Sequence, residues 1–106
     1  MKIKIIITTT DSNKTAKIIA ECLVNDNLSP CVQITPNIQS VYMWKSKLEK
    51  SGEVQLIIKT ITENVQDCKK LILKHHNYDL PEIVVTNGEI LNDKYIGWFI
   101  ENCREV

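Results

Sequence analysis

The sequence predicts a single α+β domain over residues 1–106, and three observations lead to that prediction. Segments with a hydrophobic period of two alternate with segments of helical period, in the order β-α-β-β-α-β-α. A length of 106 residues is that of one domain. Hydrophobic residues make up 43% of the chain while Gly and Pro contribute three each, which excludes a disordered or collagen-like chain.

The first two elements are a strand and a helix. Residues 2–9 are rich in Ile and Thr and carry apolar side chains on both faces, which favours a central strand. Asp11 or Ser12 can cap the helix that follows, because either side chain can accept a free N–H of the first turn. Apolar residues recur at helical spacing until Asn25-Asp26-Asn27 ends this amphipathic segment of about four turns.

Two long strands come next and are expected to pair. Residues 31–44 alternate with a period of two, and Pro36 within them indicates an edge position or a bulge, since proline cannot donate to a sheet ladder. Residues 53–60 alternate again. The polar stretch 45–52 between them therefore predicts a hairpin connection.

The last part of the chain predicts a helix, a short strand and a final helix. Thr62 can cap a helix that Leu80-Pro81 ends, because the residue before proline avoids the helical conformation. Residues 82–86 predict a strand, and the turn signal Asn87-Gly88 predicts its end. Asn92 or Asp93 can cap the last helix.

This order of elements predicts the ferredoxin-like β-α-β-β-α-β sandwich with an extra C-terminal helix. In that arrangement the helices cover one face of the sheet. The runs Ile5-Ile6-Ile7, Ile57-Ile58 and Ile83-Val84-Val85 nevertheless place apolar side chains on both faces. One helical layer cannot bury both, so we expect a partner surface, most simply an identical subunit.

The charge pattern excludes several classes of partner. Thirteen basic residues balance thirteen acidic ones, and all the basic residues but Arg104 are Lys, so we expect no nucleic-acid partner. With three glycines the chain has no Gly-rich phosphate loop. No apolar stretch reaches the roughly 20 residues that span a bilayer, and residues 1–4 lead directly into a strand. We therefore expect no membrane partner and a cytoplasmic location.

The adjacent pair His75-His76 is the candidate metal site. Neighbouring residues on a helix point about 100° apart, so both rings can bind one ion only where the helix ends or where a third ligand joins them. The pair lies at the predicted end of a helix, which permits this. The alternative interpretation is that both imidazoles cap that helix by bonding its last carbonyls.

The four cysteines are interpreted as reduced core residues, because they have no C-x-x-C spacing and lie in otherwise apolar segments. A nucleophilic pair such as Cys31 with His75 is the alternative, but nothing in the spacing requires it. No pair of acidic residues has the spacing of an acid–base couple. The sequence therefore predicts no catalytic residues and no enzyme.

Five further side chains are interpreted as structural. Tyr42, Trp44 and Tyr78 fit either a base-stacking surface or a subunit interface, and the absence of an RNP motif and of a basic surface favours the interface. Glu53 and Glu82 each open a predicted strand beside apolar residues and could be partly buried against a Lys or a backbone amide, but the sequence does not place either as buried or exposed.

Several separated motifs agree in order and spacing with one known family. The chain resembles the CutA family of divalent-cation tolerance proteins, and the match runs from the first strand to the last helix. The resemblance rests on Cys31–Pro36, Ser40–Trp44, Glu53–Thr60, His76–Ile83 and the pair Tyr95 and Trp98.

The resemblance implies a homotrimer in which long strands pair between subunits and the sheets form the interior. It also implies a role in the tolerance of copper and other divalent metals, without a catalytic activity or a required cofactor. In the family's bacterial copper site, a His-His pair is joined by a cysteine near the end of the first strand. The pair corresponds to His75 and His76, but Thr8 stands at the cysteine position.

Two consequences follow from departures from the family pattern. Without the thiolate that selects Cu(I), the imidazoles are expected to prefer Cu(II) or Zn(II), or to bind no metal. Ser46 replaces a glycine often found after the tryptophan, which is expected to alter that loop but not the fold.

The alternative functions are a trimeric small-molecule sensor resembling PII-like proteins and a purely structural trimer.

Overall fold

The computed structural model describes residues 1–104 and has the predicted order of elements. These elements are β1 (Lys2–Thr10), α1 (Asn13–Asn25), β2 (Cys31–Trp44), β3 (Lys47–Thr60), a 3-10 turn (Thr62–Asn64), α2 (Val65–His75), β4 (Val84–Glu89) and α3 (Asp93–Glu101). The four strands form one antiparallel sheet in the order β2-β3-β1-β4. The prediction that β1 is a central strand is confirmed.

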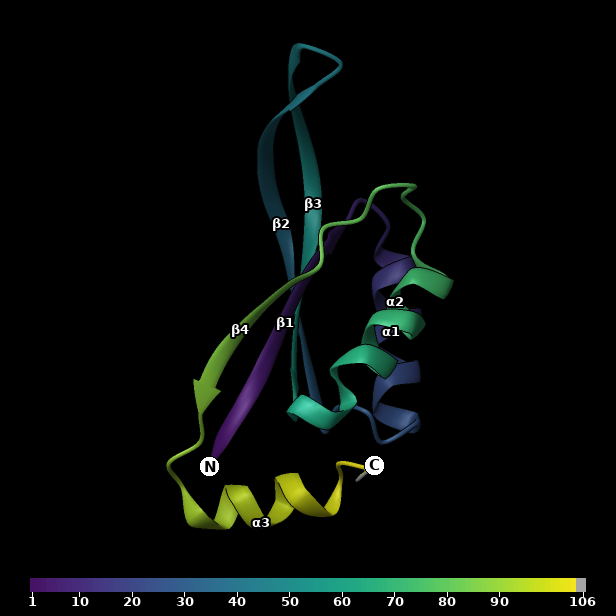
Figure 1. Ribbon diagram of the computed structural model, residues 1–106. Coiled ribbons are helices and arrows are strands. Elements are labelled where there is room, and N and C mark those ends of the chain that lie inside the picture. Colours follow the sequence, from purple (N-terminus) through teal and green to yellow (C-terminus); the bar gives the residue numbers. More distant parts are fainter. Residues whose placement is uncertain (105–106) are drawn as a thin grey trace.

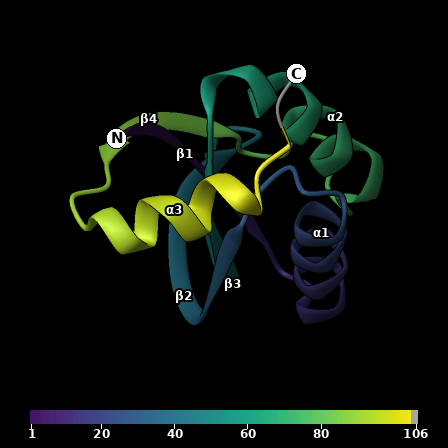
Figure 2. The ribbon, with the colours of Figure 1, turned by 90° about the horizontal axis from the view of Figure 1, so that it is seen from below.

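The helices divide between two places on the sheet. Figure 1 shows α1 and α2 side by side against one face, while α3 crosses beneath the end that carries the N-terminus. The same arrangement is visible from below in Figure 2. No helix within residues 1–104 has the length and apolar character needed to cross a membrane.

Two helices begin at a side-chain cap that the sequence offered. Ser12, and not Asp11, caps α1, because its Oγ accepts the Thr15 N–H at 3.1 Å. Asn92 caps α3, where its Oδ1 accepts the N–H groups of Lys94 and Tyr95. The prediction that Thr62 caps α2 is wrong: residues 62–64 form the 3-10 turn, and neither it nor α2 begins at a side-chain cap.

The main core lies between the sheet and the first two helices. Ile6, Leu56 and Ile58 on the strands are fully buried against α1 and α2. A second, smaller cluster joins Phe99 of α3 to Ile3. Because side chains alternate along a strand, Ile3 points to the opposite face from Ile6. The extra helix α3 therefore covers one end of the face that α1 and α2 leave open.

The connection between β2 and β3 is shorter than the predicted loop over residues 45–52. Lys45 and Ser46 have φ of 49° and 65°, and β3 begins at Lys47. A two-residue turn with both φ positive matches the twist of a hairpin, but glycine or asparagine normally marks it. Because Lys45-Ser46 lacks that signal, the polar composition predicted a loop where the structure has paired strands.

The prediction that Pro36 marks an edge position or a bulge is confirmed, and both occur. The β2–β3 register shifts between Thr35 and Ile38, and Asn37 adopts a φ of 60°. β2 is also an edge strand, so the missing N–H of proline leaves no gap in an interior ladder.

The predicted limits of the last strand are wrong. β4 begins at Val84 and continues to Glu89, so Asn87 and Gly88 lie within the strand and pair with Lys4 and Ile3. A Cβ at Gly88 would lie 2.8 Å from Cδ1 of Ile5. This glycine therefore allows close packing within the sheet and does not mark a turn.

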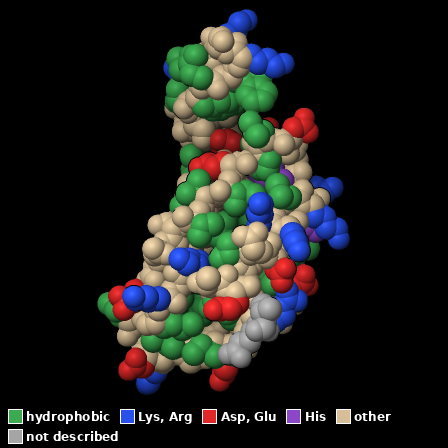
Figure 3. Space-filling view, viewed as in Figure 1, with side chains coloured by type: hydrophobic (Ala, Val, Ile, Leu, Met, Phe, Trp, Pro, Cys, Tyr) green, Lys and Arg blue, Asp and Glu red, His purple; other side chains and the backbone are tan. Residues whose placement is uncertain are grey.

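Much apolar surface stays exposed on the open face and on the hairpin. On the open face Val84 is 46% exposed, and Ile7 and Ile57 are half-buried. The outer end of the hairpin projects beyond the helices (Figure 1), and Met43 and Leu48 on it are each 65% exposed. Hydrophobic side chains gather at this end in Figure 3. One chain thus leaves uncovered the surface for which the sequence predicted a partner.

Candidate functional site

The predicted histidine pair lies at the end of α2, as expected. α2 ends at His75, and His76 follows in an extended conformation. Nδ1 of His76 accepts the backbone N–H of Tyr78 at 3.0 Å, so the ring proton is on Nε2, which donates to the Thr9 carbonyl at 2.8 Å. Both ring nitrogens of His76 are therefore engaged. The interpretation of this ring as a cap is wrong, because it bonds β1 and not the carbonyls of α2.

The residues around the pair do not form a closed metal site. Within residues 1–104, no three His, Cys, Asp or Glu side chains come together to hold an ion. Thr8 is fully buried, and its Oγ1 has no hydrogen-bond partner among the described residues. A neutral hydroxyl at this position is a poor substitute for a thiolate. An ion on His76 would also have to displace Thr9 or Tyr78, so His75 and His76 as ligands stay a prediction.

The cysteines are free thiols in or near the core. Burial raises the pKa of Cys68 to about 11 and raises that of Cys103 as well. Both thiols therefore stay protonated at neutral pH. Cys31 lies opposite Lys59 of β3, and Lys59 lies opposite Ile5 of β1. The end of α2 lies instead beside Thr9, which is four residues, or about 13 Å, from Ile5 along β1. The structure thus keeps Cys31 away from His75.

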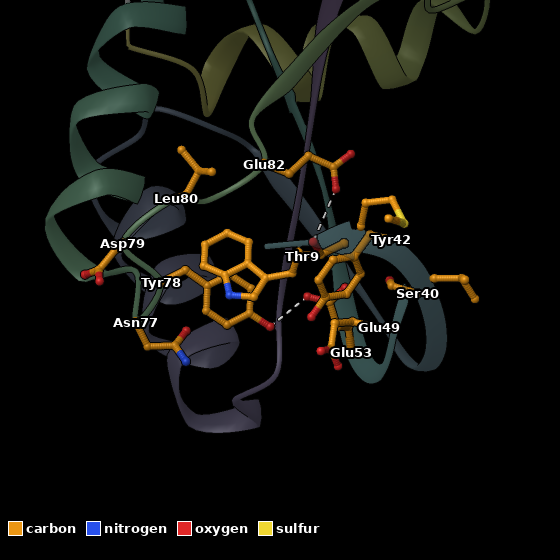
Figure 4. Close-up of a pocket in the computed structure, with 13 residues that line it drawn as sticks. Thr9, Ser40, Tyr42, Glu49, Glu53, Asn77, Tyr78, Asp79, Leu80 and Glu82 are labelled. Atoms are coloured by element: carbon orange, nitrogen blue, oxygen red, sulfur yellow. Dashed lines mark hydrogen bonds between the residues drawn. The ribbon is translucent and has the colours of Figure 1, made fainter. Parts of the chain in front are cut away.

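A cavity of about 970 Å³ lies between the β2–β3 hairpin and the segment that follows α2. This volume falls in the range of small-molecule sites. Figure 4 shows side chains from both walls, and Glu53 and Tyr78 meet across the cavity. The lining contains three aromatic residues, four acidic residues and no Lys, Arg or His: Thr9, Ser40, Val41, Tyr42, Met43, Trp44, Glu49, Glu53, Asn77, Tyr78, Asp79, Leu80 and Glu82.

Hydrogen bonds fix the wall formed by residues 76–82 to the end of β1. Thr10 donates its hydroxyl to Oδ1 of Asn77 at 2.5 Å, and Nδ2 of Asn77 donates to Asp11 at 2.7 Å. The Thr9 hydroxyl donates to Oε2 of Glu82 at 3.2 Å. Together with the His76 bonds, these contacts explain why a polar segment takes one conformation. Through its two ring nitrogens, His76 helps to hold this wall against β1.

Glu53 is the most deeply buried acidic residue of the cavity, with 8% of its surface exposed. Its Oε2 accepts the Tyr78 hydroxyl at 2.7 Å. Burial, and then the neighbouring Glu53 carboxylate, raise the pKa of Tyr78 far above its usual value, so the phenol remains a donor. The sequence left the burial of Glu53 open; the structure buries it, and its partner is a phenol and not a Lys or an amide. Glu82 is exposed.

The structure brings together the three aromatic residues that the sequence singled out. Tyr42 and Trp44 are 43% and 48% exposed on the hairpin, and Tyr78 faces them from the other wall. Sequence reasoning missed Glu49, because it lay in the predicted loop. Because β3 starts at Lys47, strand alternation places Glu49 on the same face as Glu53. This even spacing between the two glutamates was the sequence signal that could have identified Glu49.

Known proteins with similar sequences identify the family of this chain. A family model described as CutA1 divalent ion tolerance protein matches residues 4–102. The chain belongs to this CutA family. The divalent-cation tolerance protein CutA of Thermus thermophilus is 32% identical over 93% of this chain and 96% of that protein. The chloroplastic CutA of Arabidopsis thaliana is also 32% identical, but this chain spans only 55% of its length.

Solved CutA structures share the fold. The crystal structure of CutA1 from Oryza sativa is 30% identical, with a TM-score of 0.92 over 99% of this chain and 95% of that one. The Thermus thermophilus protein has a TM-score of 0.89, covering 98% of this chain and all of that one. One relative is named chloroplastic, and the CutA of Archaeoglobus fulgidus is titled periplasmic. The family is therefore not confined to one compartment, and the cytoplasmic location of this chain stays a prediction.

Proposed function

We propose that this CutA-family chain is a divalent-cation tolerance protein that works as a homotrimer of ferredoxin-like subunits. The observation that carries the proposal is the apolar surface that one chain leaves exposed, with Ile7, Ile57 and Val84 on the open face and an apolar hairpin beyond it. Exposed patches of this kind mark interfaces. The sheet order β2-β3-β1-β4, with two helices on one face, supports the ferredoxin-like subunit.

The edges of the sheet offer the contacts that assembly needs. β2 and β4 are the outer strands, so each presents unpaired backbone groups. Pairing these edges between subunits would close the ladder and bring the open faces together. Light scattering on the purified chain tests this assembly. A mass of three chains is expected, and a folded monomer would contradict the proposal.

Metal binding in this proposal is weak and rests on His75, with copper or another divalent transition metal as the ion and water or a neighbouring subunit supplying the other ligands. The ring of His76 is already hydrogen-bonded on both sides. Calorimetric titration with Cu(II) and Zn(II) should show affinity in the wild type that His75→Ala removes. Equal affinity in the wild type and the variant would exclude this site.

A second candidate function is that of a trimeric small-molecule sensor, which we place in the cytoplasm like the first. The cavity of about 970 Å³ favours it, because this volume suits a small molecule. By contrast, no third metal ligand joins the histidine pair within residues 1–104. Neither candidate function includes a catalytic step. A thermal-shift screen of metabolites tests the sensor, since a ligand of the native state raises Tm.

A further inference from the structure

We propose that Cys68 and Cys103 form a dithiol–disulfide couple that a small peroxide oxidises. The proposal goes beyond cation tolerance and depends neither on the trimer nor on metal binding at His75. Cys68 lies on α2 and belongs to the main core, whereas Cys103 follows α3 and belongs to the second cluster. Both are buried within one chain, and neither lines the hairpin cavity. A bond between them would join the two clusters covalently.

The two free thiols share one hydrogen-bond acceptor. Sγ of Cys68 lies 3.9 Å and Sγ of Cys103 lies 4.0 Å from the carbonyl oxygen of Leu28, so the two sulfurs are at most about 8 Å apart. Burial, and to a lesser degree the neighbouring Cys103 thiol, raise the pKa of Cys68 to about 11. A disulfide needs sulfurs about 2 Å apart, so rotation of the side chains about their Cα–Cβ bonds has to close the gap.

Asn64 holds Cys103 beside α2 and gives up its own bonds to do so. It is the N-cap residue of α2 but makes no side-chain cap bond. Its Nδ2 donates instead to Sγ of Cys103 at 3.4 Å and to the Arg104 carbonyl at 2.6 Å. Asn64 is fully buried, and its Oδ1 has no hydrogen-bond partner among residues 1–104. An unpaired buried oxygen is uncommon in native proteins, and a redox role of the neighbouring thiol accounts for this one.

Exposure decides which thiol reacts first. Cys103 is 8% exposed, whereas Cys68 is fully buried. The chain after α3 turns toward α2 (Figure 2), and on its outer side the Arg104–Asp67 ion pair is about half exposed, so this pair contributes little to holding the segment closed. Because both thiols are protonated at neutral pH, the reaction proceeds when this segment opens and admits the oxidant. Cys103 is therefore the attacking thiol and Cys68 the resolving thiol.

The oxidation takes two steps with hydrogen peroxide as the oxidant. The Cys103 thiolate attacks one peroxide oxygen, and the O–O bond breaks to give a sulfenic acid and one water. The Cys68 thiolate then attacks the Cys103 sulfur, so the S–S bond forms and the sulfenic oxygen leaves as a second water. The two thiols thus supply two protons and two electrons, which reduce one peroxide to two waters.

Treatment of the full chain with hydrogen peroxide, followed by peptide mapping without reductant, tests the proposal. A link between Cys68 and Cys103 within one chain is expected, and dithiothreitol should separate it. Cys22→Ser removes a thiol outside the pair and is the matched control, so it should form the same link at a rate within twofold of the wild type. Cys68→Ser removes the resolving thiol, so dimedone should trap at least fivefold more sulfenic acid at Cys103 than in the wild type.

Three results would overturn the proposal. The first is a peroxide-treated wild type in which Cys68 and Cys103 are not linked to each other. The second is a link that joins different chains, and the third is equal trapping by dimedone in the wild type and in Cys68→Ser. If Cys68→Ser does not fold, Cys68→Ala gives the same comparison, and the peptide map of the wild type needs no variant. Light scattering on the same samples reports the trimer separately.

Discussion

The hydrogen bond across the cavity gives a sharp test of how the two walls hold together. Tyr78→Phe deletes one hydroxyl and keeps the ring. That hydroxyl lies 2.7 Å from Oε2 of Glu53, which is 8% exposed. No other donor reaches Glu53 within residues 1–104, so the variant leaves a buried carboxylate without a protein partner (Figure 4). The structure therefore predicts a measurable loss of stability from one oxygen atom.

The size of that loss follows from the kind of bond removed. A hydrogen bond to a charged group contributes about 1.5–3 kcal/mol net. Glu53 borders an open cavity, where water can replace part of the lost bond, so we expect the lower half of that range, about 1.5–2 kcal/mol per chain. For a domain of this size, such a loss lowers Tm by about 6–16 °C.

Thermal unfolding followed by circular dichroism measures this change. All proteins are compared at one concentration, because association contributes to an apparent Tm. Tyr42→Phe is the matched control, since it removes the same atom from a half-exposed ring that has no hydrogen-bond partner within residues 1–104. Its effect should stay within about 0.5 kcal/mol. Equal Tm values for the two variants would refute the contribution assigned to the Glu53–Tyr78 bond.

Three further predictions concern the hairpin turn, the sheet and the core. Ser46→Gly should stabilise the chain by about 1 kcal/mol in urea unfolding, because Ser46 has a φ of 65°; a lower urea midpoint would contradict this. Gly88→Ala should destabilise it by about 1 kcal/mol, because the new methyl group would lie 2.8 Å from Cδ1 of Ile5 and that side chain must shift; an unchanged midpoint would contradict this. Burial raises the pKa of Cys68 to about 11, so the stability contributed by its neutral thiol is complete below about pH 9 and is lost as pH rises toward 11. Urea midpoints should fall less over that window in Cys68→Ala than in the wild type, and parallel curves would contradict the assignment.

The order of elements was predictable from the sequence because hydrophobic period is a local property. The strand at 2–9 and the helix after Ser12 were predicted nearly to their ends. Two of the errors fall where a local turn signal is ambiguous or is missing. Gly88 is a turn signal in isolation, but in the sheet it allows the close approach of Ile5. Lys45-Ser46 carries no turn signal, yet the pairing of the flanking strands imposes the turn.

The candidate site was less predictable, because tertiary contacts create it. Its aromatic residues were visible as a group, but whether Glu53 is buried could not be decided from the sequence. The other wall depends on hydrogen bonds between β1 and Asn77, 67 residues apart from Thr10 in sequence, which no local pattern encodes. The histidines drew attention as metal ligands, but the bonds of His76 to Thr9 and Tyr78 assign that ring to the wall.

The wall formed by residues 76–82 has a thermodynamic consequence of its own. It is held to β1 mainly by hydrogen bonds, and its Leu80 is 76% exposed. Opening this segment would break polar contacts while exposing little new apolar surface. Heat capacity and denaturant sensitivity both scale with newly exposed surface, so the opening would change neither by much. In native-state hydrogen exchange, the Tyr78 amide would therefore exchange through a local opening that is insensitive to urea, separately from the amides of β1.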